Sequence, residues 1–136
     1  MREILFRGKK FREYGENEWT EGCLLIEEDR KDKFRYRIRP TESGNMFAFP
    51  VYPETICQYT GLADKNGRKI WEGDILEAHL DEFFQDDVTR EKVIWHENGW
   101  RTQETGCDDK EYLDEFDAEN FEVIGNIFDN PELLEV

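Results

Sequence analysis

The chain has 136 residues and a formal net charge of −15. Domains usually hold about 100–200 residues, so this length predicts a single domain over residues 1–136. The 10 Phe, 5 Tyr and 4 Trp supply enough apolar area for a core, which excludes a fully disordered chain. The charged start at residues 1–7 is not typical of a signal peptide, and no apolar run is long enough for a membrane helix. We therefore expect a cytoplasmic protein without membrane contact.

The negative charge lies mainly in the carboxy-terminal part, from about residue 81. Residues 1–80 carry 14 Lys or Arg and 15 Asp or Glu, whereas residues 81–136 carry 4 and 18. Such an acidic surface repels a phosphate backbone and attracts cations, so the sequence disfavours nucleic acid and favours a partner with a basic surface. The alternative is that the acids only keep the protein soluble.

Strand patterns follow one another along the chain. Residues 34–39 alternate apolar and basic side chains, which places Phe34, Tyr36 and Ile38 on one face of a strand that ends at Pro40. β-Branched and aromatic residues favour further strands at residues 4–6, 23–26, 75–80, 88–95 and 121–127. The sequence therefore predicts a mainly β, antiparallel fold.

Two dipeptides indicate hairpin turns, and helix is scarce. Asn66-Gly67 and Asn98-Gly99 each lie between apolar runs and suit a turn that needs a positive φ. We expect short helical segments only near residues 109–117 and 131–135, the second beginning after Asn130 with Pro131 in its first turn.

A row of basic residues, spaced two apart, is the most unusual local pattern. On one strand its members would repeat about every 6.6 Å and could follow neighbouring phosphates. The favoured alternative is a solvated face whose arginines pair across the sheet with Glu21, Glu27 or the acidic carboxy-terminal part. The row consists of Lys31, Lys33, Arg35, Arg37 and Arg39.

The residues that could carry chemistry are few and scattered. Ser43 is the only serine, and His79 and His96 are the only histidines. Cys23, Cys57 and Cys107 lie far apart and form no pair with metal-ligand spacing. We therefore expect no catalytic activity, no metal and no cofactor.

Residues 59–75, which read YTGLADKNGRKIWEGDI, resemble the YopX family of phage and prophage proteins. Residues 1–7 are similar to the opening of that family and residues 123–134 to its ending. The resemblance implies a mainly β, SH3-like barrel in a bacterial or phage setting, and it implies no reaction. Within the long motif, Trp71, Glu72 and Asp74 either serve the fold or contact a partner.

Two hypotheses follow from these observations. The first is a non-enzymatic interaction module that binds an unidentified host or phage protein, through acids interleaved with aromatic residues. The second is an enzyme, or a metal-dependent or nucleic-acid-associated phage factor. Exposed aromatic residues beside the acids would favour the first, and a cleft that brings His79 or His96 against carboxylates would favour the second. The sequence leaves open whether the chain forms a homo-oligomer. The candidate contact residues outside the long motif are Asp108, Asp109, Tyr112, Asp114, Glu115 and Phe116.

Overall fold

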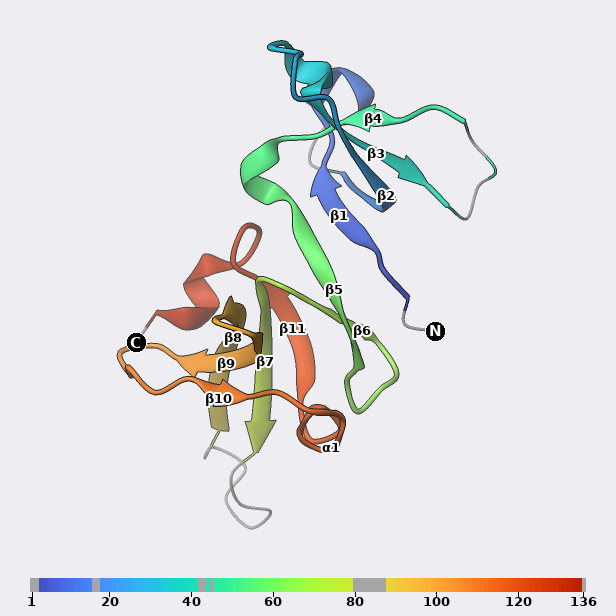
Figure 1. Cartoon of the computed structure of the whole chain (residues 1–136). Coiled ribbons are helices and arrows are strands. Elements are labelled where there is room, and N and C mark those ends of the chain that lie inside the picture. The colour runs from blue at the N-terminus through green and yellow to red at the C-terminus, as the bar shows by residue number, and fades with distance from the viewer. Residues whose placement is uncertain (1–2, 16–17, 42–43, 45, 80–87, 136) are drawn as a thin grey trace. The chain divides into compact units, whose positions relative to one another are not determined.

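A computed structural model of the chain describes residues 3–15, 18–41, 44, 46–79 and 88–135 (Figure 1). Contacts within the chain gather into two compact units, Met1–Tyr59 and Thr60–Val136. We call them the first and the second unit and describe each by itself. The expectation of a single domain stays a prediction. No helix in the described residues is long and apolar enough to cross a membrane.

The first unit is an antiparallel sheet with the strand order β4-β3-β2-β1-β5. Ile38 and Val51 are fully buried in it, and Gly8 of β1 lets both side chains approach the backbone closely. The strands are β1 (Phe6–Lys9), β2 (Trp19–Ile26), β3 (Tyr36–Pro40), β4 (Phe49–Pro50) and the start of β5 (Cys57–Ala63). Three short 3-10 helices, η1 (Arg12–Tyr14), η2 (Lys33–Arg35) and η3 (Pro53–Thr55), lie between the strands.

The basic row predicted from the sequence is not one strand. Lys33–Arg35 forms η2, and β3 begins only at Tyr36. The cause is Asp32, whose Oδ1 accepts a hydrogen bond of 3.0 Å from the backbone N–H of Phe34 and so favours a helical turn over an extended chain. Only Arg37 and Arg39 of the row lie on the strand, which includes Pro40 as its last residue.

The second unit contains a five-stranded antiparallel sheet with the order β10-β9-β8-β7-β11. Its strands are β7 (Asp74–His79), β8 (Val88–His96), β9 (Gly99–Glu104), β10 (Glu111–Tyr112) and β11 (Glu122–Asn126), and β6 (Lys69–Trp71) pairs with the end of β5. Helix α1 (Glu115–Ala118) and the 3-10 helix η4 (Pro131–Leu134) complete it. The core cluster consists of Ile70, Leu76, Val93, Leu113, Ala118 and Val123.

The mainly β, antiparallel prediction is confirmed, and every predicted strand region contains a strand. The two sheets are not closed into a barrel, so the SH3-like barrel stays a prediction. The helix expected at residues 109–117 is shorter than predicted, because residues 111–112 form β10 against the edge strand β9. Residues 131–134 are helical as predicted.

The two predicted hairpin turns differ in their outcome. Gly67 has a φ of 79°, as the Asn66-Gly67 prediction requires. In the second hairpin the turn residues are Glu97 and Asn98, and Glu97 has the positive φ of 57°. Gly99 already belongs to β9, where a Cβ would lie 3.1 Å from the ring of Tyr112. This glycine is needed for close packing rather than for the turn.

A buried carboxylate organises the long motif. Asp64 is almost fully buried, and its Oδ1 accepts hydrogen bonds of 2.9 Å from the backbone N–H groups of Asn66 and Arg68. Its Oδ2 accepts a third bond of 2.9 Å from the N–H of Val123 in β11. Burial opposes ionisation, but the three N–H groups and the charge of Arg68 outweigh it and hold the pKa of Asp64 below its ordinary value. Asp64 thereby joins the β5–β6 turn to β11.

We expect the substitution Asp64→Asn to lower the free energy of unfolding by about 1–3 kcal/mol at pH 7, because one amide oxygen cannot replace two carboxylate oxygens. Urea unfolding measures this loss. Since the pKa of Asp64 is lowered in the fold, its contribution is present above the ordinary aspartate pKa and is lost as the pH falls through the lowered value. The matched control Asp108→Asn, at an exposed site, should change stability by less than about 0.5 kcal/mol. Equal stability of the two variants would contradict this role.

Candidate protein-interaction surface

Residues 108–119, here called the acidic segment, lead from the edge strand β10 to helix α1, which precedes β11 at the opposite edge of the sheet. The segment contains β10 and α1, with Leu113 and Asp114 between them. Leu113 and Ala118 are buried in the core cluster, and the N–H of Leu113 donates to the carbonyl of Trp100 at 3.0 Å. Two apolar side chains therefore fix the segment to the sheet.

The remaining candidate residues of the segment point outward. Tyr112 is 60% exposed and Phe116 is 76% exposed. The four predicted acids Asp108, Asp109, Asp114 and Glu115 are exposed as well. The structure thus brings together on one short segment the six residues that the sequence singled out there.

Two of these residues also have a structural role. The Oδ1 of Asp114 accepts a hydrogen bond of 2.8 Å from the N–H of Asp117 and so caps α1. The guanidinium of Arg101 lies 3.9 Å from the ring centroid of Tyr112, and the ring also packs on Gly99. Tyr112 is therefore held on the sheet, whereas Phe116 is presented to solvent.

The carboxylates of the acidic segment repel one another, because no basic side chain in the described residues pairs with most of them. Within the described part of the chain, Asp108, Asp109, Glu111, Glu115 and Glu119 form no ion pair. The nearby Lys110 donates to the backbone carbonyl of Asp108, at 3.2 Å, rather than to a carboxylate. Burial and the negative charge of Asp114 raise the pKa of Asp117. A cationic partner would relieve this repulsion.

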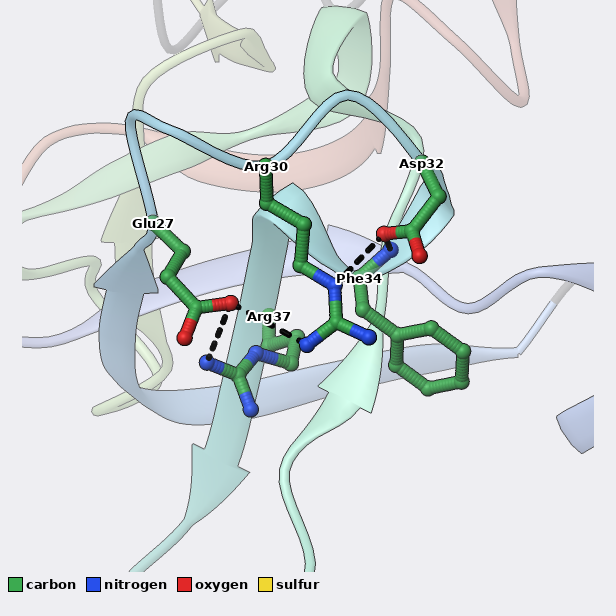
Figure 2. Close-up of polar contacts among 5 residues, drawn as sticks. All are labelled: Glu27, Arg30, Asp32, Phe34 and Arg37. Atoms are coloured by element: carbon green, nitrogen blue, oxygen red, sulfur yellow. Dashed lines mark hydrogen bonds and ion pairs between the residues drawn. The ribbon is translucent and has the colours of Figure 1, made fainter.

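The acids of the first unit are arranged differently. Figure 2 shows Arg30 between two carboxylates, 3.2 Å from Glu27 and 2.8 Å from Asp32, with Arg37 reaching Glu27 at 3.8 Å. The hydrogen bond from Arg30 lowers the pKa of Asp32. Ion pairs also join Lys33 to Glu13 and Lys10 to Glu18. Here exposed acids have basic neighbours, as the favoured alternative for the basic row requires.

The candidate residues in the long motif are placed unlike those of the acidic segment. Trp71 is 3% exposed and Asp74 is 1% exposed, and the Oδ2 of Asp74 accepts a hydrogen bond of 2.8 Å from the N–H of Trp71. Glu72 is half-buried. Burial of two of the three residues favours a role in the fold. Their contact with a partner stays a prediction.

Sequence reasoning missed Trp95, which is 53% exposed although it lies in β8. Its ring makes an edge-to-face contact with Trp100, its cross-strand neighbour in β9, at a centroid distance of 4.9 Å. Position in a strand suggested burial, and the only signal of exposure was its nearness to the hairpin turn at Glu97.

The histidines and cysteines do not form a site in the described residues. The Nε2 of His96 lies 3.6 Å from Oε1 of its sequence neighbour Glu97, at an exposed turn. His79 is exposed at the end of β7. No group of three His, Cys, Asp or Glu in the described residues could hold a metal ion.

Comparisons with known proteins identify relatives of the chain. A family model described as YopX protein matches residues 6–135. Among solved structures, the chain is similar to protein EF1440 from Enterococcus faecalis, with a TM-score of 0.62 and 23% identity, covering 99% of this chain and 100% of that one. At this identity the likeness concerns the fold alone. No curated protein matches the chain.

The acidity of the second unit has a measurable consequence at Glu91. Burial, together with the charges of Glu104 and Glu111, raises the pKa of Glu91 despite hydrogen bonds from Thr102 and Thr89. Its ionised form therefore costs stability, and this cost grows as the pH rises from the ordinary glutamate pKa through the raised value.

We expect Glu91→Gln to raise the melting temperature by a few degrees at pH 7, with the gain disappearing below the ordinary pKa of 4.5, where Glu91 is neutral in both states. Differential scanning calorimetry at several pH values measures this. The control Glu132→Gln, at an exposed site, should have no effect. A loss of stability that is the same at every pH would contradict the assignment, since it would mean that the hydrogen bonds dominate.

Proposed function

The chain belongs to the YopX family, and from this premise we propose that it is a phage-type cytoplasmic protein that binds a host or phage protein and catalyses no reaction. The partner presents a basic surface, and the acidic segment contacts it. The observation that supports this most directly is the joint exposure of Tyr112 and Phe116 among acids that have no ion-pair partner in the described residues.

Both ingredients of a protein interface are present in the segment. Unpaired carboxylates speed the encounter with a basic surface, and the opposite charge of the partner offsets the cost of desolvating them. An exposed aromatic ring supplies the contact that slows dissociation, because such anchors carry most of the binding energy in interfaces. Solubility alone would explain the charges, but it gives no reason to expose Phe116.

The criterion set by the sequence also favours the interaction hypothesis. Exposed aromatic residues lie beside the acids, as that hypothesis requires. His96 has its sequence neighbour Glu97 as its carboxylate contact, at a turn rather than in a cleft. The enzymatic alternative therefore lacks the arrangement that would support it in the described residues.

The first experiment reverses the charge of the segment. Asp108, Asp109, Glu115 and Glu119 are changed together to Lys, and Asp114 is kept because it caps α1. Tagged wild-type and variant proteins are used to capture partners from lysates of phage-infected bacteria, and the partner is then titrated at 50 and 500 mM NaCl. We expect the variant to bind at least about tenfold more weakly at low salt and to lose most of the salt dependence.

A control variant separates the surface from the net charge. Changing Glu28, Asp29, Glu132 and Glu135 to Lys gives the same net charge at exposed positions outside the segment. This control should bind nearly as well as the wild type at 500 mM NaCl. If a folded variant with the reversed segment captures the same partner with unchanged affinity, the acidic segment is not the contact surface.

The aromatic anchor is tested separately. We expect Phe116→Ala to weaken binding of the captured partner by at least about fivefold, mainly through faster dissociation, because the ring is buried only in the complex. Its melting temperature should equal that of the wild type, since the ring is exposed in the free protein. Surface plasmon resonance measures both rates. Ile4→Ala, which removes an exposed apolar side chain in the first unit, should leave them unchanged.

A further inference from the structure

The sheet of the first unit assembles a basic surface different from the row in the sequence. Trp19 of β2 lies opposite Lys9 of β1. Arg39 and Arg37 of β3 lie opposite Cys23 and Leu25 of β2, whose side chains are on the same face of β2 as Trp19. Arg7 precedes Lys9 by two residues. Because side chains alternate between faces and cross-strand partners share a face, these five residues lie on the same face. We call them the basic face.

The basic face is open to solvent and has an aromatic centre. All five side chains are partly exposed, including Trp19. The guanidinium carbon of Arg7 lies 4.7 Å from the ring centroid of Trp19, and the Nζ of Lys9 lies 5.5 Å from it. Same-face residues repeat about every 6.7 Å along a strand, and neighbouring strands lie about 4.8 Å apart. Arg7 and Lys9 therefore lie beside the ring, whereas Arg39 and Arg37 lie opposite Cys23 and Leu25, about 13 and 20 Å further along β2.

A hollow beside Trp19 provides room for a ring-shaped ligand. Its volume is about 320 Å³, and its lining includes Trp19, Pro40, Thr41 and the carboxylates of Glu3 and Glu21. These carboxylates repel phosphate, but they accept hydrogen bonds from the exocyclic amino groups of nucleobases. The hollow thus suits a base, whereas the basic residues that suit the backbone lie outside its lining, with Arg7 directly opposite Glu21.

We propose that the basic face binds single-stranded nucleic acid. A base enters the hollow and stacks against Trp19, while Arg39 and Arg37 contact phosphates, a phosphate replacing Glu27, which lies 3.8 Å from Arg37, as the partner of that guanidinium. Paired and stacked bases of a duplex cannot reach the ring in this way, and an acidic polypeptide has the charge but not the planar groups.

The charge distribution between the units makes this binding compatible with an acidic protein. Residues 1–59 carry 11 Lys or Arg and 11 Asp or Glu, so the whole net charge of −15 belongs to residues 60–136. At physiological ionic strength the Debye length is about 8 Å, so charges further away are largely screened. The local excess of cations on the basic face then decides the interaction.

The test is fluorescence anisotropy of a labelled 20-nucleotide DNA strand of mixed sequence, titrated with the full chain between 50 and 300 mM NaCl. We expect the double variant Arg37→Gln and Arg39→Gln to reduce the slope of log affinity against log salt by about 1.4, since each single-strand phosphate contact contributes about 0.7. Affinity at 50 mM should fall at least about tenfold. The control Lys65→Gln and Lys110→Gln, with the same charge change in the second unit, should match the wild type.

The contribution of Trp19 to binding is measured separately, by tryptophan fluorescence. The DNA strand should quench tryptophan fluorescence of the wild type, and Trp19→Phe should lose this quenching while retaining most of the affinity. Trp19→Leu should bind the DNA strand at least about fivefold more weakly than the wild type, because leucine has no aromatic ring on which a base can stack. Circular dichroism checks that each variant keeps its fold.

Three results would overturn the proposal: no binding of the strand at 50 mM NaCl, an unchanged salt slope in the folded arginine variant, or equal binding of duplex DNA or polyglutamate. The proposal does not depend on the acidic segment. The variant with the reversed segment should still bind the DNA strand, and the arginine variant should still bind the basic protein partner, so each proposal can fail alone.

Discussion

The second unit depends on one buried carboxylate. Asp64 holds the turn between β5 and β6 through two backbone N–H groups and β11 through a third. Without this acceptor, the buried N–H of Val123 and the partly exposed N–H groups of Asn66 and Arg68 would lose their partner, at a cost of about 1–3 kcal/mol in a protein whose stability is about 5–15 kcal/mol. The same strand β11 contributes Val123 to the core cluster on which the acidic segment is fixed. The long motif thus acts as a scaffold, and the candidate contact surface lies elsewhere.

The acidic segment illustrates a conflict between stability and binding. Its anchors Leu113 and Ala118 gain free energy by burial, while the surrounding carboxylates repel one another without neutralising neighbours in the described residues. Glu91 shows that this repulsion reaches half-buried positions, since its pKa is raised. A protein selected for stability alone would place basic residues there, as the first unit does with Arg30 at Glu27 and Lys33 at Glu13. Under the proposed function, these acids are a surface available to a cationic partner.

The two units divide the chemistry of the chain between them. The first has balanced charges, with a basic face around Trp19, and the second carries the whole net charge. Surfaces of opposite sign on one chain allow it to hold a basic and an acidic macromolecule together. Because the partners differ in sign, neither competes for the surface of the other. If both proposals hold, the chain acts as an adaptor.

Local patterns in the sequence were sufficient for the Asn66-Gly67 turn, for the exposed acids near Phe116 and for strands in the regions of β1, β2, β3, β7, β8 and β11, because alternation, positive φ and charge are properties of neighbouring residues. Local patterns failed where distant residues compete. Residues 111–112 pair with β9 rather than forming a helix, and Asp32 ends the basic row before β3. The basic face depends on strand register, which brings Arg7 and Arg39 to one side of Trp19 from positions 32 residues apart in the chain. Composition and periodicity determined the class of fold and the sign of its surface. Only tertiary pairing decided which charged side chains meet, because register depends on the packing of every strand at once.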